Sequence, residues 1–236
     1  MARRLQTRYP ADPNVAAIGA LIGDRNRAAM LFALLDGREL PASELAFRAG
    51  TSPTAASAHL AKLVAGGLLN VTTSGRQRLF RLASPDIGHA MEALAVIARP
   101  QPVVALSQNT AMARLREARS CYDHLAGRLG VAFTDYLLKA RALRLSDDEF
   151  TLTRTGEALL ATLEIDVDAA RRKRRNFARA CTDWTERRPH LAGSLGASVM
   201  EHFFVSGWIA RNRQDRALRI TDKGHAELVQ RFHIHV

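Results

Sequence analysis

The sequence predicts a mostly α-helical fold with small β-hairpins, of the α+β class. Apolar residues recur at helical spacing along most of the 236-residue chain. Short alternating stretches with glycine at their turns separate the helices and are typical of hairpins. The length is sufficient for two domains, which we place at residues 1–100 and 101–236.

Two helices precede the central stretch of the first domain. Residues 1–13 contain two prolines and are predicted to form an arm. A helix rich in small and branched apolar residues follows from Asn14. Asp24 is the predicted N-cap of the next helix, which Asp36 and Gly37 end. One more helix is expected after the central stretch, from Ser84 to the residue before Pro100.

The central stretch, residues 41–82, begins with a short helix, a tight turn and a longer helix. The short helix spans Ser43 to Arg48, and Gly50 ends it. Ser52 followed by Pro53 indicates an N-cap and a first helical residue. The apolar residues of the longer helix repeat at helical spacing: Ala56, Leu60 and Leu63.

A β-hairpin closes this stretch. Apolar and polar residues alternate from Leu69 to Leu82, with a turn at Ser74 and Gly75. The order helix, turn, helix and two-stranded wing is typical of a winged helix-turn-helix. In that fold the second helix enters the major groove of DNA.

Residues 14–98 resemble the ArsR-type winged-helix transcriptional regulators. The resemblance depends on SELAFRAG, on SPTAASAHLAKLVAGGLL with SAHL at 57–60, and on a Gly-Arg wing. It implies a DNA-binding regulator, a repressor in most such proteins. It also implies a homodimer packed through residues 14–22 and 85–98, with two recognition helices on a roughly palindromic operator of double-stranded DNA.

The resemblance fails at the positions where metal-sensing relatives bind their ions. The short helix contains no cysteine, and the closing helix offers only Asp86, His89 and Glu92 of a larger ligand set. We therefore expect no metal site on these helices. His89 is better interpreted as a polar position on the dimer helix.

The start of a recognition helix faces base edges. Thr54 and Ser57 are expected to hydrogen-bond to DNA, and Ala55 or Ala58 to touch a thymine methyl group. Lys62 and the wing arginines are expected to contact phosphates or a narrow minor groove. His59 is either a DNA contact or a helix-packing residue. The candidate DNA-contacting residues are Ser52, Thr54, Ala55, Ser57, His59, Lys62, Arg76, Arg78 and Arg81.

The second domain contains a degenerate repeat. Three motifs recur in order: ARSCYD and ARACTD, HLAGRLG and HLAGSLG, LTRTGEALL and ITDKGHAEL. We place two winged-helix-like units at about 112–164 and 172–232. Each is predicted to contain a helix with the Cys-x-Asp motif, a short HLAG helix, a longer helix, a hairpin and a final helix. Thr153 and Thr221 are the predicted N-caps of the final helices, and the acidic residues 147–149 argue against a second DNA site.

The repeated Cys-x-Asp motif has three interpretations: small buried apolar residues, the lining of a ligand pocket, or redox or metal sensing. Thiol, carboxylate and imidazole groups are ligands for a soft or borderline metal. Arg119 and Arg179 could lower the pKa of the thiols. We predict no cofactor. The candidate effector or redox residues are Cys121, Asp123, His124, Cys181, Asp183, Trp184 and His190.

Composition narrows the function. The net charge of +11 favours a polyanionic partner. Two cysteines do not form a disulfide framework, and no apolar run has the length of a membrane span, so we expect a cytoplasmic protein without membrane association. No catalytic motif is present, and we predict no enzyme. The leading hypothesis is a sequence-specific DNA-binding regulator, a repressor whose operator binding is modulated by a small-molecule effector sensed in the C-terminal half. The alternative is an architectural or non-specific basic DNA-binding protein.

Overall fold

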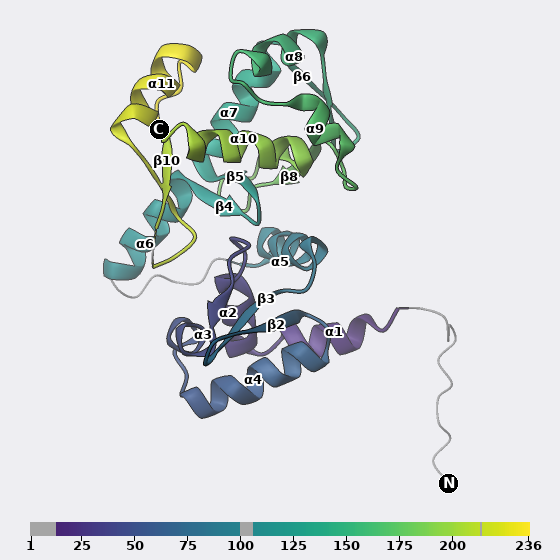
Figure 1. The fold of residues 1–236 in the computed structure, drawn as a ribbon, viewed down its shortest axis with the longest axis vertical. Coiled ribbons are helices and arrows are strands. Elements are labelled where there is room, and N and C mark those ends of the chain that lie inside the picture. The colour runs from purple at the N-terminus through teal and green to yellow at the C-terminus, as the bar shows by residue number, and fades with distance from the viewer. Residues whose placement is uncertain (1–12, 100–105, 213) are drawn as a thin grey trace. The chain divides into compact units, whose positions relative to one another are not determined.

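The computed structural model describes residues 13–99, 106–212 and 214–236. Within these residues the chain forms two compact units (Figure 1). Of the described residues, unit 1 comprises 13–32 with Glu39–Ala83, and unit 2 comprises Ala33–Arg38 with those that follow from Ser84 to Val236. The predicted arm lies almost wholly outside the described residues. The domain boundary at residue 100 stays a prediction.

The N-terminal elements follow the predicted order of a winged helix-turn-helix. The helices are α1 (Val15–Ile22), α2 (Arg25–Ala33), α3 (Ala42–Ala49) and α4 (Pro53–Ala65), and the strands are β1 (Leu40–Pro41), β2 (Leu69–Ser74) and β3 (Gln77–Leu82). Gly50 ends α3 in the left-handed conformation. The wing has three strands in the order β1-β3-β2, because Leu40 pairs with Phe80. β1 has only two residues and was not predicted from the sequence.

Unit 2 repeats one order of elements: helix, hairpin, helix, hairpin, helix. α5 (Pro85–Ile97) precedes the repeats. The first set is α6 (Leu106–Glu117), β4 (Arg119–Cys121), β5 (His124–Ala126), α7 (Gly127–Lys139), β6 (Leu143–Ser146), β7 (Glu149–Leu152) and α8 (Arg154–Ala161). The second set is α9 (Val167–Arg172), β8 (Arg179–Thr182), β9 (Pro189–Ala192), α10 (Gly193–Val205), β10 (Ile209–Arg211), β11 (Leu218–Ile220) and α11 (Asp222–Phe232).

The helices predicted for the Cys-x-Asp and HLAG motifs were wrong. Both motifs form antiparallel hairpins, β4–β5 in the first repeat and β8–β9 in the second. Every residue of β4 and β5 is buried, so these three-residue strands lack the alternation by which a half-buried strand is recognised. Each repeat therefore has a hairpin where a helix-turn-helix would have its first short helix.

The glycines of HLAGRLG and HLAGSLG have matching backbone roles in the two repeats. Gly127 and Gly193 have φ of 75° and 83°, which turns each strand directly into the following helix. Gly130 and Gly196 lie against the strand that precedes them. A Cβ on Gly130 would lie 2.4 Å from the carbonyl oxygen of Leu125, and Gly196 has the same close approach to Leu191.

The two repeats share one core. α7 packs on β9, and α10 packs on β5, so each long helix covers the hairpin of the other repeat. β6, β7, β8 and β9 also form one four-stranded sheet. The buried aromatic residues of this core meet edge to face: Phe133, Phe203, Trp208 and Phe232. None of the described helices combines the length and apolar character that a membrane span needs.

The predicted N-caps of α8 and α11 are confirmed. The Thr153 hydroxyl accepts a hydrogen bond from the Gly156 amide at 3.1 Å, and Thr221 accepts one from Gly224 at 2.9 Å. Asp24 caps α2 in the same way, through the Arg27 amide at 2.9 Å. These contacts fix the start of each helix.

Candidate functional sites

Helix α4 presents a polar face to solvent. Its buried side consists of Ala56, Leu60 and Leu63, as predicted. Thr54, Ser57 and Lys62 are exposed on the opposite side. This face therefore offers hydroxyl and ammonium groups to an external partner.

Two of the candidate serines already have local roles in α4. The Ser52 hydroxyl is the N-cap and accepts a hydrogen bond from the Ala55 amide at 3.3 Å. The Ser57 hydroxyl donates to the carbonyl oxygen of Pro53 at 3.0 Å. Ser57 retains acceptor capacity on its oxygen, whereas Ser52 serves mainly to begin the helix.

His59 packs within unit 1. Its Nε2 lies 3.4 Å from the Asn26 amide nitrogen, and its Nδ1 lies 3.6 Å from an Asp24 carboxylate oxygen. The structure thus favours the helix-packing interpretation of this residue. His59 thus connects α4 to the start of α2.

The wing places three arginines in different surroundings. Arg76 is exposed in the turn between β2 and β3, beside Gly75 with a φ of 59°. The Arg78 guanidinium lies over the Phe80 ring at 5.3 Å, and Arg81 lies 3.7 Å from Glu39. Arg76 is therefore the wing cation best placed to reach a phosphate.

Helices α1 and α5 each expose large apolar side chains. Val15 of α1 is 72% exposed and Ile97 of α5 is 78% exposed. No residue of α1 is buried. Such faces are normally covered by a partner.

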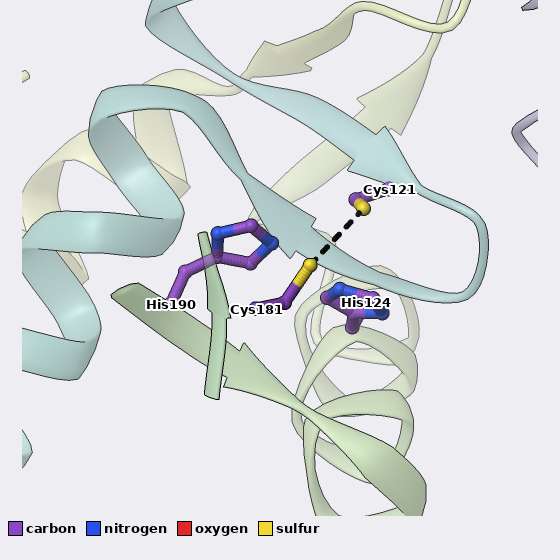
Figure 2. Close-up of side chains that lie close together, drawn as sticks. All are labelled: Cys121, His124, Cys181 and His190. Atoms are coloured by element: carbon purple, nitrogen blue, oxygen red, sulfur yellow. Dashed lines mark hydrogen bonds between the residues drawn. The ribbon is translucent and has the colours of Figure 1, made fainter. Parts of the chain in front are cut away.

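Four side chains of unit 2 converge on one buried point (Figure 2). Cys121 of β4 stands opposite His124 of β5, and Cys181 of β8 stands opposite His190 of β9. Each hairpin thus contributes one thiol and one imidazole. The four ligand atoms all lie within 4.8 Å of one another. We call these residues the cysteine–histidine cluster.

The two thiols of the cluster are close but separate. Their sulfur atoms are 3.9 Å apart, compared with about 2.05 Å in a disulfide. The hydrogen bond between the thiols and their burial raise the pKa of Cys121. The contact with the Cys121 thiol, together with the nearby imidazole groups of His124 and His190, outweighs burial and lowers the pKa of Cys181. One thiolate is therefore favoured next to the two imidazole rings.

The imidazole rings carry nitrogens without partners. His124 and His190 are both 0% exposed, and their rings stack with centroids 5.1 Å apart. His124 Nε2 and both ring nitrogens of His190 have no hydrogen-bond partner. Buried polar atoms are normally satisfied, so these three nitrogens need an explanation.

Asp123 lies beside the cluster. Its carboxylate is 3.4 Å from His124 Nδ1 and also pairs with Arg175. Burial opposes ionisation of Asp123, but the hydrogen bonds from His124 and Arg175 outweigh it and lower the pKa to about 2. The carboxylate is thus available to orient the His124 ring.

Asp183, the equivalent residue of the second repeat, has a denser set of contacts. Its Oδ2 accepts from Arg119 at 2.8 Å and from the Gly127 amide at 2.7 Å. Burial opposes its ionisation, but the Arg119 charge and the hydrogen bonds from Thr185, Gly127 and Glu186 lower its pKa. Asp183 Oδ2 also lies 3.8 Å from His190 Nδ1.

Arg119 and Trp184 do not belong to the cluster. The buried Arg119 guanidinium pairs with Asp183 and stacks over the Trp184 ring at 4.7 Å. The expectation that Arg119 would act on a thiol was therefore wrong. Of the seven candidate effector residues, four form the cluster, two aspartates flank it and Trp184 lies outside.

Sequence reasoning missed the partners that come from distant elements. Arg175 reaches Asp123, and Arg216 pairs with the buried Glu92 of α5. His89 of α5 lies with its ring centroid 6.3 Å from that of His124. Only the hairpin register could have indicated the cluster, by pairing each cysteine with a histidine.

Comparison with known proteins identifies the class of the chain. Residues 22–72 match the family described as "Helix-turn-helix domain". The HTH-type transcriptional regulator YdfF of Bacillus subtilis (strain 168) is 40% identical over 213 residues, covering 90% of this chain and 94% of that protein.

Solved structures are similar to a smaller part of the chain. HlyU from Vibrio cholerae N16961 is 30% identical, covers 34% of this chain and 86% of its own, and has a TM-score of 0.32. The homodimeric winged helix-turn-helix DNA-binding domain Mb0332 from Mycobacterium bovis is 28% identical, covers 41% and 89%, and has a TM-score of 0.35. The full-length relative decides the assignment: the chain belongs to the family of HTH-type transcriptional regulators.

Proposed function

We propose that this protein is a sequence-specific DNA-binding repressor of the ArsR type whose operator affinity depends on an effector bound by unit 2. One observation carries the proposal: in a chain of this family, α4 turns a polar face to solvent beside an exposed wing arginine. The net charge of +11 supports binding to a polyanion.

The residues of this face have distinct roles in the proposal. Thr54 and Ser57 face base edges at the start of α4, and Ala55 contacts a thymine methyl group. Lys62 and Arg76 neutralise phosphates. Arg78 and Arg81 support the wing, while Ser52 and His59 hold α4 in place.

The protein acts as a homodimer in this proposal. The exposed apolar residues of α1 and α5, Val15 and Ile97 among them, supply the interface. Two α4 helices then read two half-sites of a roughly palindromic operator. Replacing Ile97 with Glu should yield a monomer by light scattering and lower operator affinity.

Unit 2 supplies the response to a signal. The match to the HTH-type regulator extends over 213 residues, too many to fit within the first 100, so it includes most of this unit. A buried cluster of polar residues there supports a sensing role. Coupling requires the effector to bind the DNA-competent and DNA-incompetent states with different affinity.

The test begins with the operator. The purified full chain is used to select fragments from genomic DNA, and the enriched sites are footprinted. The proposal expects protected half-sites and a much higher affinity for them than for random DNA at the same salt concentration. Equal affinity for both would overturn it and favour the non-specific alternative.

A further inference from the structure

We propose that the cysteine–histidine cluster binds a single zinc ion as a closed tetrahedral site. The ligand set comes half from the β4–β5 hairpin and half from the β8–β9 hairpin. Figure 2 shows the four side chains directed toward one another from these strands.

The spacing of the ligand atoms fits one ion. Zinc–sulfur bonds of about 2.3 Å at a tetrahedral angle place two sulfur atoms about 3.8 Å apart. The sulfurs of Cys121 and Cys181 are 3.9 Å apart. Both histidines bring a ring nitrogen within 4.8 Å of these sulfurs.

The unpartnered ring nitrogens are available as metal ligands. Asp123 accepts from His124 Nδ1, which leaves the lone pair on Nε2 for a metal. His190 lies near Asp183 through Nδ1, and its Nε2 is likewise unpartnered. An ion bound to both rings would satisfy nitrogens that are otherwise buried without partners.

The chemistry of the donors selects the metal class. Two thiolates with two imidazoles in tetrahedral arrangement suit zinc, whereas magnesium and calcium require oxygen ligands. The carboxylates of Asp123 and Asp183 lie outside the four donors and orient the rings. Four protein donors complete a tetrahedral shell, so no position is left for water, as in structural and not catalytic zinc sites.

A disulfide between Cys121 and Cys181 would explain the positions of the two thiols but not those of the two histidines. Oxidation would join the two sulfurs but leave the buried imidazole nitrogens unsatisfied. A metal uses all four side chains and explains why each hairpin pairs a cysteine with a histidine.

Zinc binding also offers a route to regulation, and this part rests on the proposed function. His89 of α5 lies next to His124 of the cluster, with ring centroids 6.3 Å apart. α5 is a proposed dimer helix. A change at His124 would therefore act on the element that sets the spacing of the recognition helices.

The first experiment measures the metal alone. The reduced full chain is stripped with a chelator and titrated with Zn²⁺ against a chromophoric competitor. Co²⁺ is added separately as a spectroscopic probe. We expect one equivalent of Zn²⁺, and a Co²⁺ spectrum with intense tetrahedral d–d bands and thiolate-to-cobalt charge transfer.

Variants assign the ligands. Cys121→Ser with Cys181→Ser, and separately His190→Gln, should each lower zinc affinity at least tenfold. His235→Gln, at an exposed histidine, is the matched control and should bind like the wild type. The Co²⁺ spectrum of the wild type tests the site even if a variant fails to fold. Absence of both one-to-one zinc binding and the thiolate band would overturn the site, as would unchanged binding by the folded cysteine variant.

The second experiment measures operator affinity of the wild type with Zn²⁺ and with chelator. A several-fold difference that disappears in the cysteine variant supports regulation through the cluster. Zinc binding without any change in operator affinity would overturn the regulatory part and leave the site. Zinc binding by a protein that prefers no operator would overturn the proposed function alone.

Discussion

The polar residues of α4 and those of the cysteine–histidine cluster are placed in opposite environments. Thr54, Ser57 and Lys62 are exposed. Among these three side chains, Ser57 forms a hydrogen bond within the helix, to the Pro53 carbonyl oxygen. Both cluster histidines are 0% exposed and are enclosed by two hairpins. The first set is accessible to a large partner, whereas the second set is enclosed and inaccessible to one.

This difference predicts which measured quantity each substitution changes. Replacing an exposed residue of α4 or the wing should alter DNA binding and leave the free energy of unfolding nearly constant. Replacing a residue around the cluster should first change stability, because its partners are buried with it.

The largest effect is expected for Asp183→Ala. It leaves the Arg119 guanidinium buried without its carboxylate, which typically costs about 3–5 kcal/mol. Asp123→Ala is the matched control, since the Asp123 side chain is 29% exposed and should lose about 1 kcal/mol or less. Urea denaturation in the presence of chelator measures the free energy of unfolding of both variants without a contribution from bound metal. Equal losses would contradict the contrast between the two repeats.

Gly196→Ala should come next, at about 1–3 kcal/mol of lost stability. Its Cβ would lie 2.4 Å from the Leu191 carbonyl oxygen and 3.2 Å from His124 Cβ. Gly19→Ala in α1, measured in the monomeric Ile97→Glu background, is the control, because within one chain a Cβ there meets nothing within 4 Å. That control should gain about 0.5–1 kcal/mol, as alanine does over glycine in a helix. Denaturation midpoints decide the outcome, and a stable Gly196→Ala protein would refute the close packing.

Arg76→Ala should weaken DNA binding without loss of stability. Removing one phosphate contact should reduce the slope of log affinity against log salt by about one unit. Arg172→Ala, at an exposed arginine of α9, serves as the control and should leave the slope unchanged. Titrations of labelled operator at several salt concentrations measure this slope for both variants. A constant slope for Arg76→Ala would remove the proposed role of the wing.

Ser57→Ala is expected to have the smallest effect, about 1 kcal/mol of discrimination between operator and mutated operator. Loss of the Ser57 hydroxyl should relax specificity. It should leave the slope of log affinity against log salt unchanged, because the hydroxyl carries no charge. Ser52→Ala should instead lower stability by about 1 kcal/mol through loss of the N-cap. Competition assays with single-base operator variants, alongside denaturation, separate the two serines.

Local sequence patterns predicted the helices and their ends well. Thr153 and Thr221 were identified as N-caps because each precedes an amphipathic helix, and Gly50 ends α3 as expected. A cap needs only residues three or four positions apart. Such features can therefore be predicted from a short stretch of sequence.

Features that depend on tertiary packing were harder to predict. β4 and β5 are short and buried throughout, so periodicity could not distinguish them from helices. Arg119 was expected near a thiol but pairs with Asp183 of the other repeat. The cluster members were identified as candidates from the repeat, but only the strand register places each cysteine opposite a histidine.

The burial of the cluster has a consequence for response time. An ion enclosed by β4–β5 and β8–β9 could leave only when one of these hairpins opens. The rate of release would then follow local unfolding and not the ion concentration outside. A protein built in this way would register a lasting change in metal supply and ignore a brief one.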